Sequence, residues 1–174
     1  MSESVHKHRE SAPKYVRVAV LTISDTRTPE TDTGGDTIEE LMRDVGHEIV
    51  GRGIVKDDAE RIRAEIVDLL ARPDVDAVIT TGGTGISARD TTYEVVERML
   101  DKKLDGFGEI FRVLSYEEIG AAAILSRAVA GAVGAKLVAC LPGSRNAVRL
   151  AVEKLLVPEI AHIVFELKKH QEGS

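Results

Sequence analysis

The stretch "DAVITTGGTG", from Asp76 to Gly85, joins a short apolar run to a turn that is rich in glycine. An apolar run of this length, bounded by glycine, is typical of a strand buried on both faces of a sheet. Glycines in a turn indicate either backbone angles that other residues avoid or a close approach of another group to the backbone. The stretch therefore predicts a strand at Asp76–Thr80 and raises the question of what comes close to the turn.

The rest of the chain repeats this alternation between apolar strands and segments with helical periodicity. Further strands are predicted at Val16–Ile23, Glu48–Val55 and Lys136–Leu141, and we expect the segment before Lys136 to be a hairpin or a buried extended piece. Helices are predicted at Asp36–Val45, Asp58–Leu70, Thr92–Leu100, Phe107–Ile119 and Ser144–Leu156, and from Pro158 to near Lys168. The pattern predicts an α/β fold, a three-layer α/β/α sandwich with a mostly parallel central sheet.

The length and composition of the chain limit its organisation and its partners. A chain of 174 residues favours one domain, which we place at residues 15–170 after a flexible N-terminal arm at residues 1–14. The net charge of -6, without a dense block of lysine and arginine, argues against nucleic-acid binding. No apolar run approaches the roughly 18 residues of a membrane helix. The single cysteine, Cys140, cannot form an intrachain disulfide, so we expect a cytoplasmic protein.

In a parallel sheet, ligands bind beyond the carboxyl ends of the strands. That rule places three predicted loops on one edge: Ser24–Gly35, Gly82–Asp90 and Pro142–Ser144. It places Asp57 beside them, at the end of the second strand. The sequence therefore predicts a ligand site at this edge.

The glycine turn can be interpreted in two ways. A glycine-rich turn between a strand and a helix exposes backbone amides that suit a phosphate group. Here no Gly-Lys-Ser/Thr follows, and the spacing of the dinucleotide fingerprint is missing, so two common nucleotide folds lose support. A plain tight turn explains the stretch equally well.

Two carboxylates near this turn carry the same ambiguity. Asp90 suits a helix cap or a cation site beside phosphate, and Asp57 stands at a capping-box spacing from Glu60. If both faced a bound phosphate they would repel it, so the functional interpretation requires a divalent cation. Ser144 is likewise either a plain helix cap or part of an anion site, and Arg89 and Arg145 either offset ligand charge or are solvated.

Several stretches taken together resemble one known family. "LTISDTR", "DTGG", "ITTGGTG", "RDTTYE", "GFGEIFRVLSYEEIG", "LSRAVAG" and "LPGS" occur in the order seen in the molybdenum cofactor biosynthesis B and molybdopterin adenylyltransferase (MoaB/MogA) family. The resemblance runs from about Tyr15 to Leu167. "GGTG" alone is unspecific, whereas "GFGEIFRVLSYEEIG" followed by "LSRAVAG" is specific and looks like the MoaB branch.

The resemblance implies an α/β/α fold in a homo-oligomer, a trimer or a dimer of trimers. It implies that the protein binds the pterin molybdopterin and, with ATP and Mg²⁺, transfers AMP to its terminal phosphate. By the same resemblance, the catalytic and Mg²⁺-holding carboxylates are Asp57 and Asp90. The residues that line the ligand site are then Gly82, Gly83, Thr84, Gly85, Ser115, Gly143 and Ser144.

The sequence departs from the family pattern in one place. Adenylyltransferase members often carry a proline soon after "LPG", but here the run is "LPGSRNA". Two alternatives to the enzyme therefore stay open: a non-catalytic carrier of molybdopterin, and a structural oligomer in which the glycine loop is only a turn. The alanine-rich stretch Ile119–Ala135 is either a subunit contact or an internal core segment.

Overall fold

The computed structural model describes residues 15–169, and its central element is a six-stranded sheet with the order β2-β1-β3-β6-β5-β4. The strands are β1 (Arg17–Ile23), β2 (Glu48–Val55), β3 (Ala77–Thr81), β4 (Lys102–Lys103), β5 (Val129–Val133) and β6 (Lys136–Leu141). The first three strands and β6 are parallel, whereas β5 runs antiparallel to both of its neighbours. The predicted mostly parallel sheet is confirmed, as is the predicted hairpin before Lys136. The predicted arm at residues 1–14 lies outside the described part of the chain.

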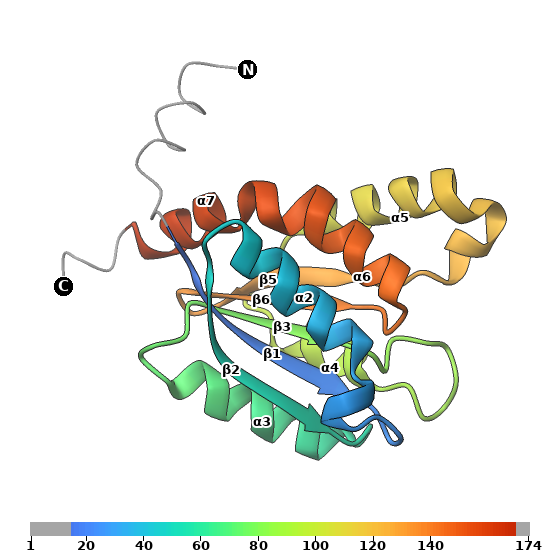
Figure 1. Cartoon of the computed structure of the whole chain (residues 1–174), viewed down its shortest axis with the longest axis horizontal. Coiled ribbons are helices and arrows are strands. Elements are labelled where there is room, and N and C mark those ends of the chain that lie inside the picture. Colours follow the sequence, from blue (N-terminus) through green and yellow to red (C-terminus); the bar gives the residue numbers. More distant parts are fainter. Residues whose placement is uncertain (1–14, 170–174) are drawn as a thin grey trace.

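Helices cover both faces of the sheet, which confirms the predicted three layers (Figure 1). On one face lie α2 (Thr33–Asp44), α5 (Asp105–Ile119), α6 (Arg145–Ala151) and α7 (Val157–Lys168), and on the other lie α3 (Ala59–Ala71) and α4 (Thr92–Met99). Successive side chains of β1 alternate between these layers: Val18 and Val20 pack in one core cluster, and Leu21 and Ile23 in the other. The continuous apolar run in the sequence therefore has its explanation in burial on both faces.

The first helix begins earlier than predicted. It was expected at Asp36, but α2 starts at Thr33, because the buried side chain of Asp32 accepts a hydrogen bond from the Gly35 amide at 3.0 Å. The weak helix propensity of Gly34 and Gly35 hid this start. The predicted loop after β1 is therefore shorter, and it contains a 3-10 turn, η1 (Pro29–Thr31).

The predicted break before Pro158 is wrong. A π-helical turn, η3 (Val152–Leu156), connects α6 to α7 without an intervening loop. In this wider turn the Val157 amide donates to the Val152 carbonyl. Proline lacks the amide that an α-helix would need, and the start of α7 tolerates that loss.

Two smaller elements were not predicted. The short strand β4 pairs with β5, and a Cβ on Gly131 would collide with the Lys102 carbonyl oxygen, so this crossing requires glycine. A 3-10 segment, η2 (Gly120–Leu125), follows α5. The alanine-rich stretch is thus divided, because Ile124 in η2 is exposed and Val129 in β5 belongs to the core. None of the helices within residues 15–169 is long and apolar enough to cross a membrane.

Candidate functional site

The three predicted loops and the segment after β2 that contains Asp57 meet at the edge formed by the carboxyl ends of the parallel strands, as predicted (Figure 1). Backbone hydrogen bonds tie the loops together: the Gly82 amide donates to the Leu141 carbonyl at 3.1 Å, and the Ser24 amide donates to the Val55 carbonyl at 2.9 Å. A Cβ on Gly143 would lie 3.2 Å from the Gly82 Cα. The glycine loop and the Pro-Gly-Ser turn are therefore direct neighbours, although about 60 residues separate them in the sequence.

The protein's own packing requires glycine at the start of the loop. Gly82 and Gly83 have φ angles of 99° and 62°, the left-handed region that other residues rarely adopt. A Cβ on Gly82 would collide with the Ile23 carbonyl oxygen, and a Cβ on Gly83 would collide with the Thr92 hydroxyl. The groups that approach this backbone thus include the chain itself, so these two glycines do not by themselves require a ligand.

Asp57 is free of the capping role that its spacing suggested. The neighbouring Asp58 caps α3, by accepting from the Arg61 amide at 3.0 Å. Asp57 Oδ1 instead accepts hydrogen bonds from the Thr91 amide at 3.3 Å and the Thr91 hydroxyl at 3.0 Å. The Thr91 hydroxyl is thereby engaged, and Thr91, which precedes α4, makes no side-chain capping bond to that helix.

Asp90 lies on the other side of the loop and is bonded differently. Its Oδ2 accepts from the Ser87 amide at 3.1 Å and from the Ser87 hydroxyl at 2.5 Å. These bonds hold the pKa of Asp90 below its usual value, with the bond from the Ser87 hydroxyl the main cause. Burial raises the pKa of Asp57, although the bonds from Thr91 oppose that rise. The environment therefore separates the two carboxyl pKa values, as at many sites with paired acids.

The two carboxylates bracket the glycine loop. A Cβ on Gly83 would lie 2.7 Å from Asp57 Oδ2, and a Cβ on Gly85 would lie 2.5 Å from Asp90 Oδ2. Within residues 15–169 no group of three or more His, Cys, Asp or Glu side chains is arranged to hold a metal ion. Two carboxylates are nonetheless the usual protein contribution to a Mg²⁺ site, in which phosphate and water oxygens complete the shell. The chemistry of this donor set therefore fits Mg²⁺ only together with a bound phosphate.

A pocket of about 590 Å³ opens between the loop, the end of α5 and the start of α6. Most of the residues predicted to line a ligand site lie in its wall: Thr84, Gly85, Ser115 and Ser144. Gly82 and Gly143 instead border a small cavity of about 30 Å³, and Gly83 lines neither of the two. Arg145 also lines the larger pocket, whereas Arg89 pairs with Asp25 on the surface. Four of the predicted ligand residues thus line one pocket, and Asp57 and Asp90 do not line it.

Both predicted serines serve the fold as well as the pocket. Ser144 caps α6 by accepting from the Ala147 amide at 3.4 Å. Ser115 is buried in α5 and donates its hydroxyl to the Phe111 carbonyl at 2.8 Å. A ligand in the pocket would find the Ser115 oxygen as a hydrogen-bond acceptor, because its proton is already engaged.

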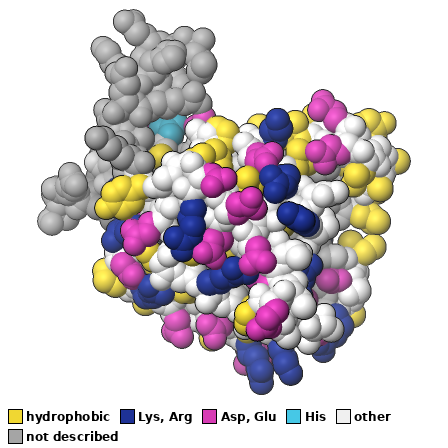
Figure 2. All heavy atoms as spheres, in the orientation of Figure 1, with side chains coloured by type: hydrophobic (Ala, Val, Ile, Leu, Met, Phe, Trp, Pro, Cys, Tyr) yellow, Lys and Arg dark blue, Asp and Glu magenta, His cyan; other side chains and the backbone are white. Residues whose placement is uncertain are grey.

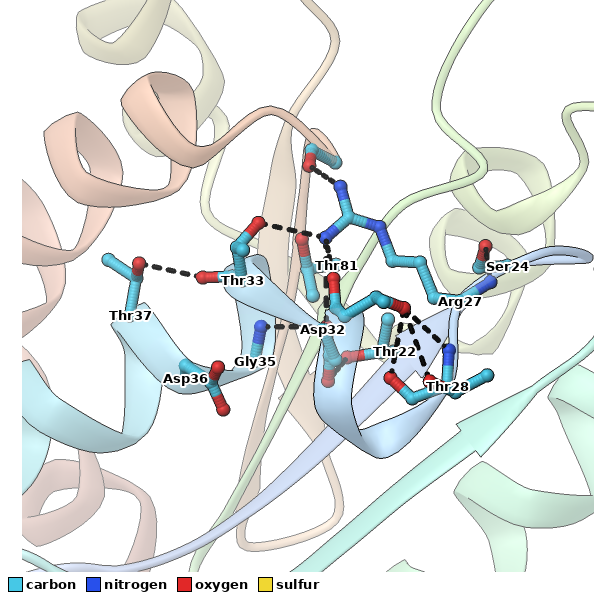
Figure 3. Close-up of polar contacts among 12 residues, drawn as sticks. Thr22, Ser24, Arg27, Thr28, Asp32, Thr33, Gly35, Asp36, Thr37 and Thr81 are labelled. Carbon is cyan, nitrogen blue, oxygen red and sulfur yellow. Dashed lines mark hydrogen bonds and ion pairs between the residues drawn. The ribbon is translucent and has the colours of Figure 1, made fainter.

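Two arginines were not predicted as site residues, although both lie in the quoted motifs "LTISDTR" and "LSRAVAG". Arg27 donates to the Gly143 carbonyl at 3.2 Å and to the Thr33 hydroxyl at 3.0 Å, and so joins the loop after β1 to the Pro-Gly-Ser turn (Figure 3). Arg127 reaches the glycine loop and lines the pocket of about 590 Å³. Both positions lie in a recognised motif, but Gly143, which Arg27 contacts, and the glycine loop, which Arg127 contacts, are distant from them in sequence.

A second pocket, of about 670 Å³, lies beside the open edge of β2. Its wall includes Asp25, Arg27, Arg52 and Lys56, and none of the site residues predicted from the sequence. The buried carboxylate of Asp32 anchors this region, accepting from Thr22 at 2.8 Å and from Arg52 at 3.1 Å. The guanidinium of Arg52 is shared further with Asp36 and Glu39, so its charge is already neutralised within the protein.

Comparison with known proteins identifies relatives along most of the chain. Residues 19–162 match the family model described as a probable molybdopterin binding domain. The chain is 51% identical over 167 residues to the molybdenum cofactor biosynthesis protein B of Bacillus cereus, covering 95% of this chain and 99% of that protein. It is 52% identical over 157 residues to the protein of the same description from Staphylococcus carnosus, with 88% and 92% covered.

Solved structures agree with these relatives. A crystal structure of a molybdenum cofactor biosynthesis protein B superposes with a TM-score of 0.89 at 51% identity, and the match covers 92% of this chain and 100% of that one. The tungsten cofactor synthesizing protein MoaB from Pyrococcus furiosus superposes with a TM-score of 0.81 at 38% identity, over 90% and 99% of the two chains. The similarity thus covers both the sequence and the fold, including every segment that contributes to the site.

Proposed function

The chain belongs to the family of probable molybdopterin-binding domains that includes the molybdenum cofactor biosynthesis B proteins, and we propose that it transfers AMP from Mg-ATP to molybdopterin. A role in molybdenum cofactor biosynthesis follows from its membership of the family. The acceptor in the proposed reaction is the terminal phosphate of the pterin. The observation that carries the proposal is the pair of carboxylates, Asp57 and Asp90, on the two sides of the glycine loop.

The shape and lining of the pocket of about 590 Å³ support binding of the pterin there. Its volume is in the usual range for sites that take small molecules. Arg145 in its wall offsets the negative charge of a phosphate, and Thr84 and Gly85 bring the glycine loop to the same wall. We propose that the terminal phosphate lies at the loop, where it comes nearest to Asp57 and Asp90.

The two carboxylates would hold Mg²⁺ with the phosphates of ATP, and the ion would neutralise charge as the phosphoryl centre reacts. The protein would then act by positioning its two substrates and by electrostatic stabilisation. Asp57 Oδ2 is available for this role, because it accepts no hydrogen bond within residues 15–169. Asp90 would have to exchange its bonds from Ser87 for the ion.

Because Asp90 would have to give up its bonds from Ser87, we also consider a second function. In a carrier that binds molybdopterin without reacting, Asp90 would keep its bonds to Ser87 and serve only to shape the loop. The carrier would bind the pterin and release no pyrophosphate from ATP.

Pyrophosphate release from ATP and Mg²⁺ in the presence of molybdopterin separates the two functions. We expect release from the wild-type protein and a loss of at least about 100-fold in Asp57→Asn and in Asp90→Asn. Asp68→Asn, on the exposed side of α3, is the matched control and should leave the rate unchanged. Pterin binding without release by the wild type would establish the carrier instead.

We further propose that the protein is a homo-oligomer, which an exposed apolar surface on α5 and η2 supports. The large side chains of this surface are more than half exposed: Ile110, Val113, Tyr116, Ile119, Ile124 and Leu125. Figure 2 shows hydrophobic side chains gathered along the edge of the molecule where Figure 1 places the end of α5. A second copy of the chain is the occupant we expect, because the resemblance to the MoaB/MogA family implies trimers or dimers of trimers.

Light scattering after size-exclusion chromatography tests this surface. Ile124→Glu, at the most exposed position of the surface (84%), should lower the oligomeric state, whereas Val67→Glu on α3, 46% exposed, should not. If the mass of the Ile124→Glu variant equals that of the wild type, this surface is not a subunit interface.

We also propose that the protein works in the cytoplasm. Its one cysteine, Cys140, is a free thiol in the core, and burial raises its pKa to about 12. A thiol of this kind stays protonated and inert, which suits a reducing compartment.

A further inference from the structure

Arg127 holds the glycine loop by its backbone. Its Nε donates to the Thr84 carbonyl at 2.9 Å, and its Nη2 donates to the Gly85 carbonyl at 2.5 Å. These are two consecutive carbonyl groups, and a planar guanidinium is well suited to reach both, because its donors lie in a rigid fork. The fork therefore constrains the planes of two neighbouring peptide groups within the loop.

Residues of α4 hold the guanidinium itself. Glu94 accepts from Arg127 Nη1 at 2.5 Å, and the Arg127 guanidinium carbon lies 4.7 Å from the centre of the Tyr93 ring. In this ion pair 25% of the Arg127 side chain and 42% of the Glu94 side chain are accessible, so the fork is less exposed to water than the carboxylate that anchors it. The loop is thus attached through Arg127 to a helix that packs in the core.

The peptide between Thr84 and Gly85 connects Arg127 to Asp90. Its carbonyl accepts from Arg127, and the Asp90 carboxylate packs against the Gly85 Cα, where a Cβ would lie 2.5 Å from Asp90 Oδ2. A displacement of the guanidinium would rotate this peptide and move the Gly85 Cα against which Asp90 packs. Tyr93, Glu94 and Arg127 thus support one side of the Asp90 carboxylate, and the amide and hydroxyl of Ser87 bond to it directly.

We propose that Arg127 is a positioning residue, which fixes the Thr84–Gly85 peptide and through it the place of Asp90 at the loop. The catalytic consequence rests on the proposed transfer of AMP, but the structural consequence does not. Lysine cannot replace arginine here, because an ammonium group has no planar fork that can serve two carbonyls and a carboxylate together.

The experiment compares Arg127→Lys with Arg149→Lys, a matched control on α6 whose arginine pairs with the exposed Glu153 at 2.7 Å. The first measurement is the backbone order parameter of the Gly85 amide by NMR relaxation. We expect a value near about 0.85 in the wild type and in Arg149→Lys, and below about 0.6 in Arg127→Lys. Glu94→Gln, which leaves Arg127 in place but weakens its anchor, should give an intermediate value and serves if Arg127→Lys does not fold.

The second measurement divides the kinetic effect. Since a small misplacement of a reacting group costs on the order of 100-fold, we expect kcat for AMP transfer to fall by about that factor in Arg127→Lys. Binding of molybdopterin should change by less than about threefold, because lysine keeps the positive charge in the pocket wall. A lost affinity with unchanged kcat would make Arg127 a ligand-binding residue and refute the positioning role.

The two measurements fail separately. An ordered Gly85 in both Arg127→Lys and Glu94→Gln, or equal loss of order in Arg149→Lys, would overturn the inference even if AMP is transferred. If the wild-type protein transfers no AMP, the proposed function fails, and the order parameter of Gly85 alone decides whether Arg127 holds the loop.

Discussion

Replacing Thr92 with valine should make the protein more stable, although the substitution deletes a hydroxyl group. Thr92 is fully buried, at 0% exposure. Among the buried side-chain oxygen and nitrogen atoms of residues 15–169, its Oγ1 is the one that has no hydrogen-bond partner. A buried polar group of this kind destabilises a protein by about 1–3 kcal/mol. Valine has a similar branched shape and removes that cost.

The gain is reduced by crowding at the loop. The Thr92 hydroxyl lies against the Gly83 Cα, where a Cβ would collide with it. A methyl group is larger than a hydroxyl, and we assign about 1 kcal/mol to the resulting strain. The net expectation is a rise of about 1 kcal/mol in the free energy of unfolding, or about 3 °C in Tm for a chain of this size.

Urea denaturation at one fixed protein concentration measures the change, because assembly would otherwise contribute to the apparent stability. Thr22→Val is the matched control: Thr22 is also buried, at 2%, but its hydroxyl donates to the Asp32 carboxylate at 2.8 Å. That variant should lose about 1–2 kcal/mol. Destabilisation of Thr92→Val by the same amount would show that Thr92 Oγ1 has a partner, and the reasoning would be wrong.

Two further predictions concern the loop and the titration of a buried histidine. Gly83→Ala should lose about 3 kcal/mol or more, because φ is 62° and a Cβ would meet Thr92 and Asp57, whereas Gly134→Ala, with φ 58° and open space, should lose about 1 kcal/mol. Equal losses in urea denaturation would show that backbone angle alone makes glycine necessary at both positions. Burial lowers the pKa of His47, which accepts a hydrogen bond from the Val16 amide at 3.2 Å. Since the unfolded chain binds this proton more readily, the free energy of unfolding should fall as the pH drops below the ordinary histidine pKa of about 6.5. The pH dependence should be weaker in His47→Gln, and an identical pH profile in that variant would contradict the assignment.

The strands and most helices could be predicted because their signals are local. The apolar run of β1 alternates between two core clusters, and that burial on both faces is what a continuous run indicates. The failures are also physical. Gly34 and Gly35 concealed the start of α2, whose cap depends on the buried Asp32, and the π turn before Pro158 has no distinct local signal.

The candidate site could be predicted only in part. The edge of the sheet and the grouping of Thr84, Gly85, Ser115 and Ser144 around one pocket agree with the sequence analysis. Their roles toward a ligand stay predictions. Arg127 was missed because its contacts with Thr84 and Gly85 join segments about 40 residues apart, and no periodicity records such a pair.

The sequence by itself determined the alternation of strands and helices, the shared edge of the loops and the resemblance to one family. The tertiary structure decided which groups touch. Asp57 and Asp58 both precede α3; Asp58 caps the helix, whereas Asp57 is bonded to Thr91, which lies beyond the next strand. Periodicity is set by neighbours within a few residues, whereas hydrogen-bond partners are set by the packing of distant segments.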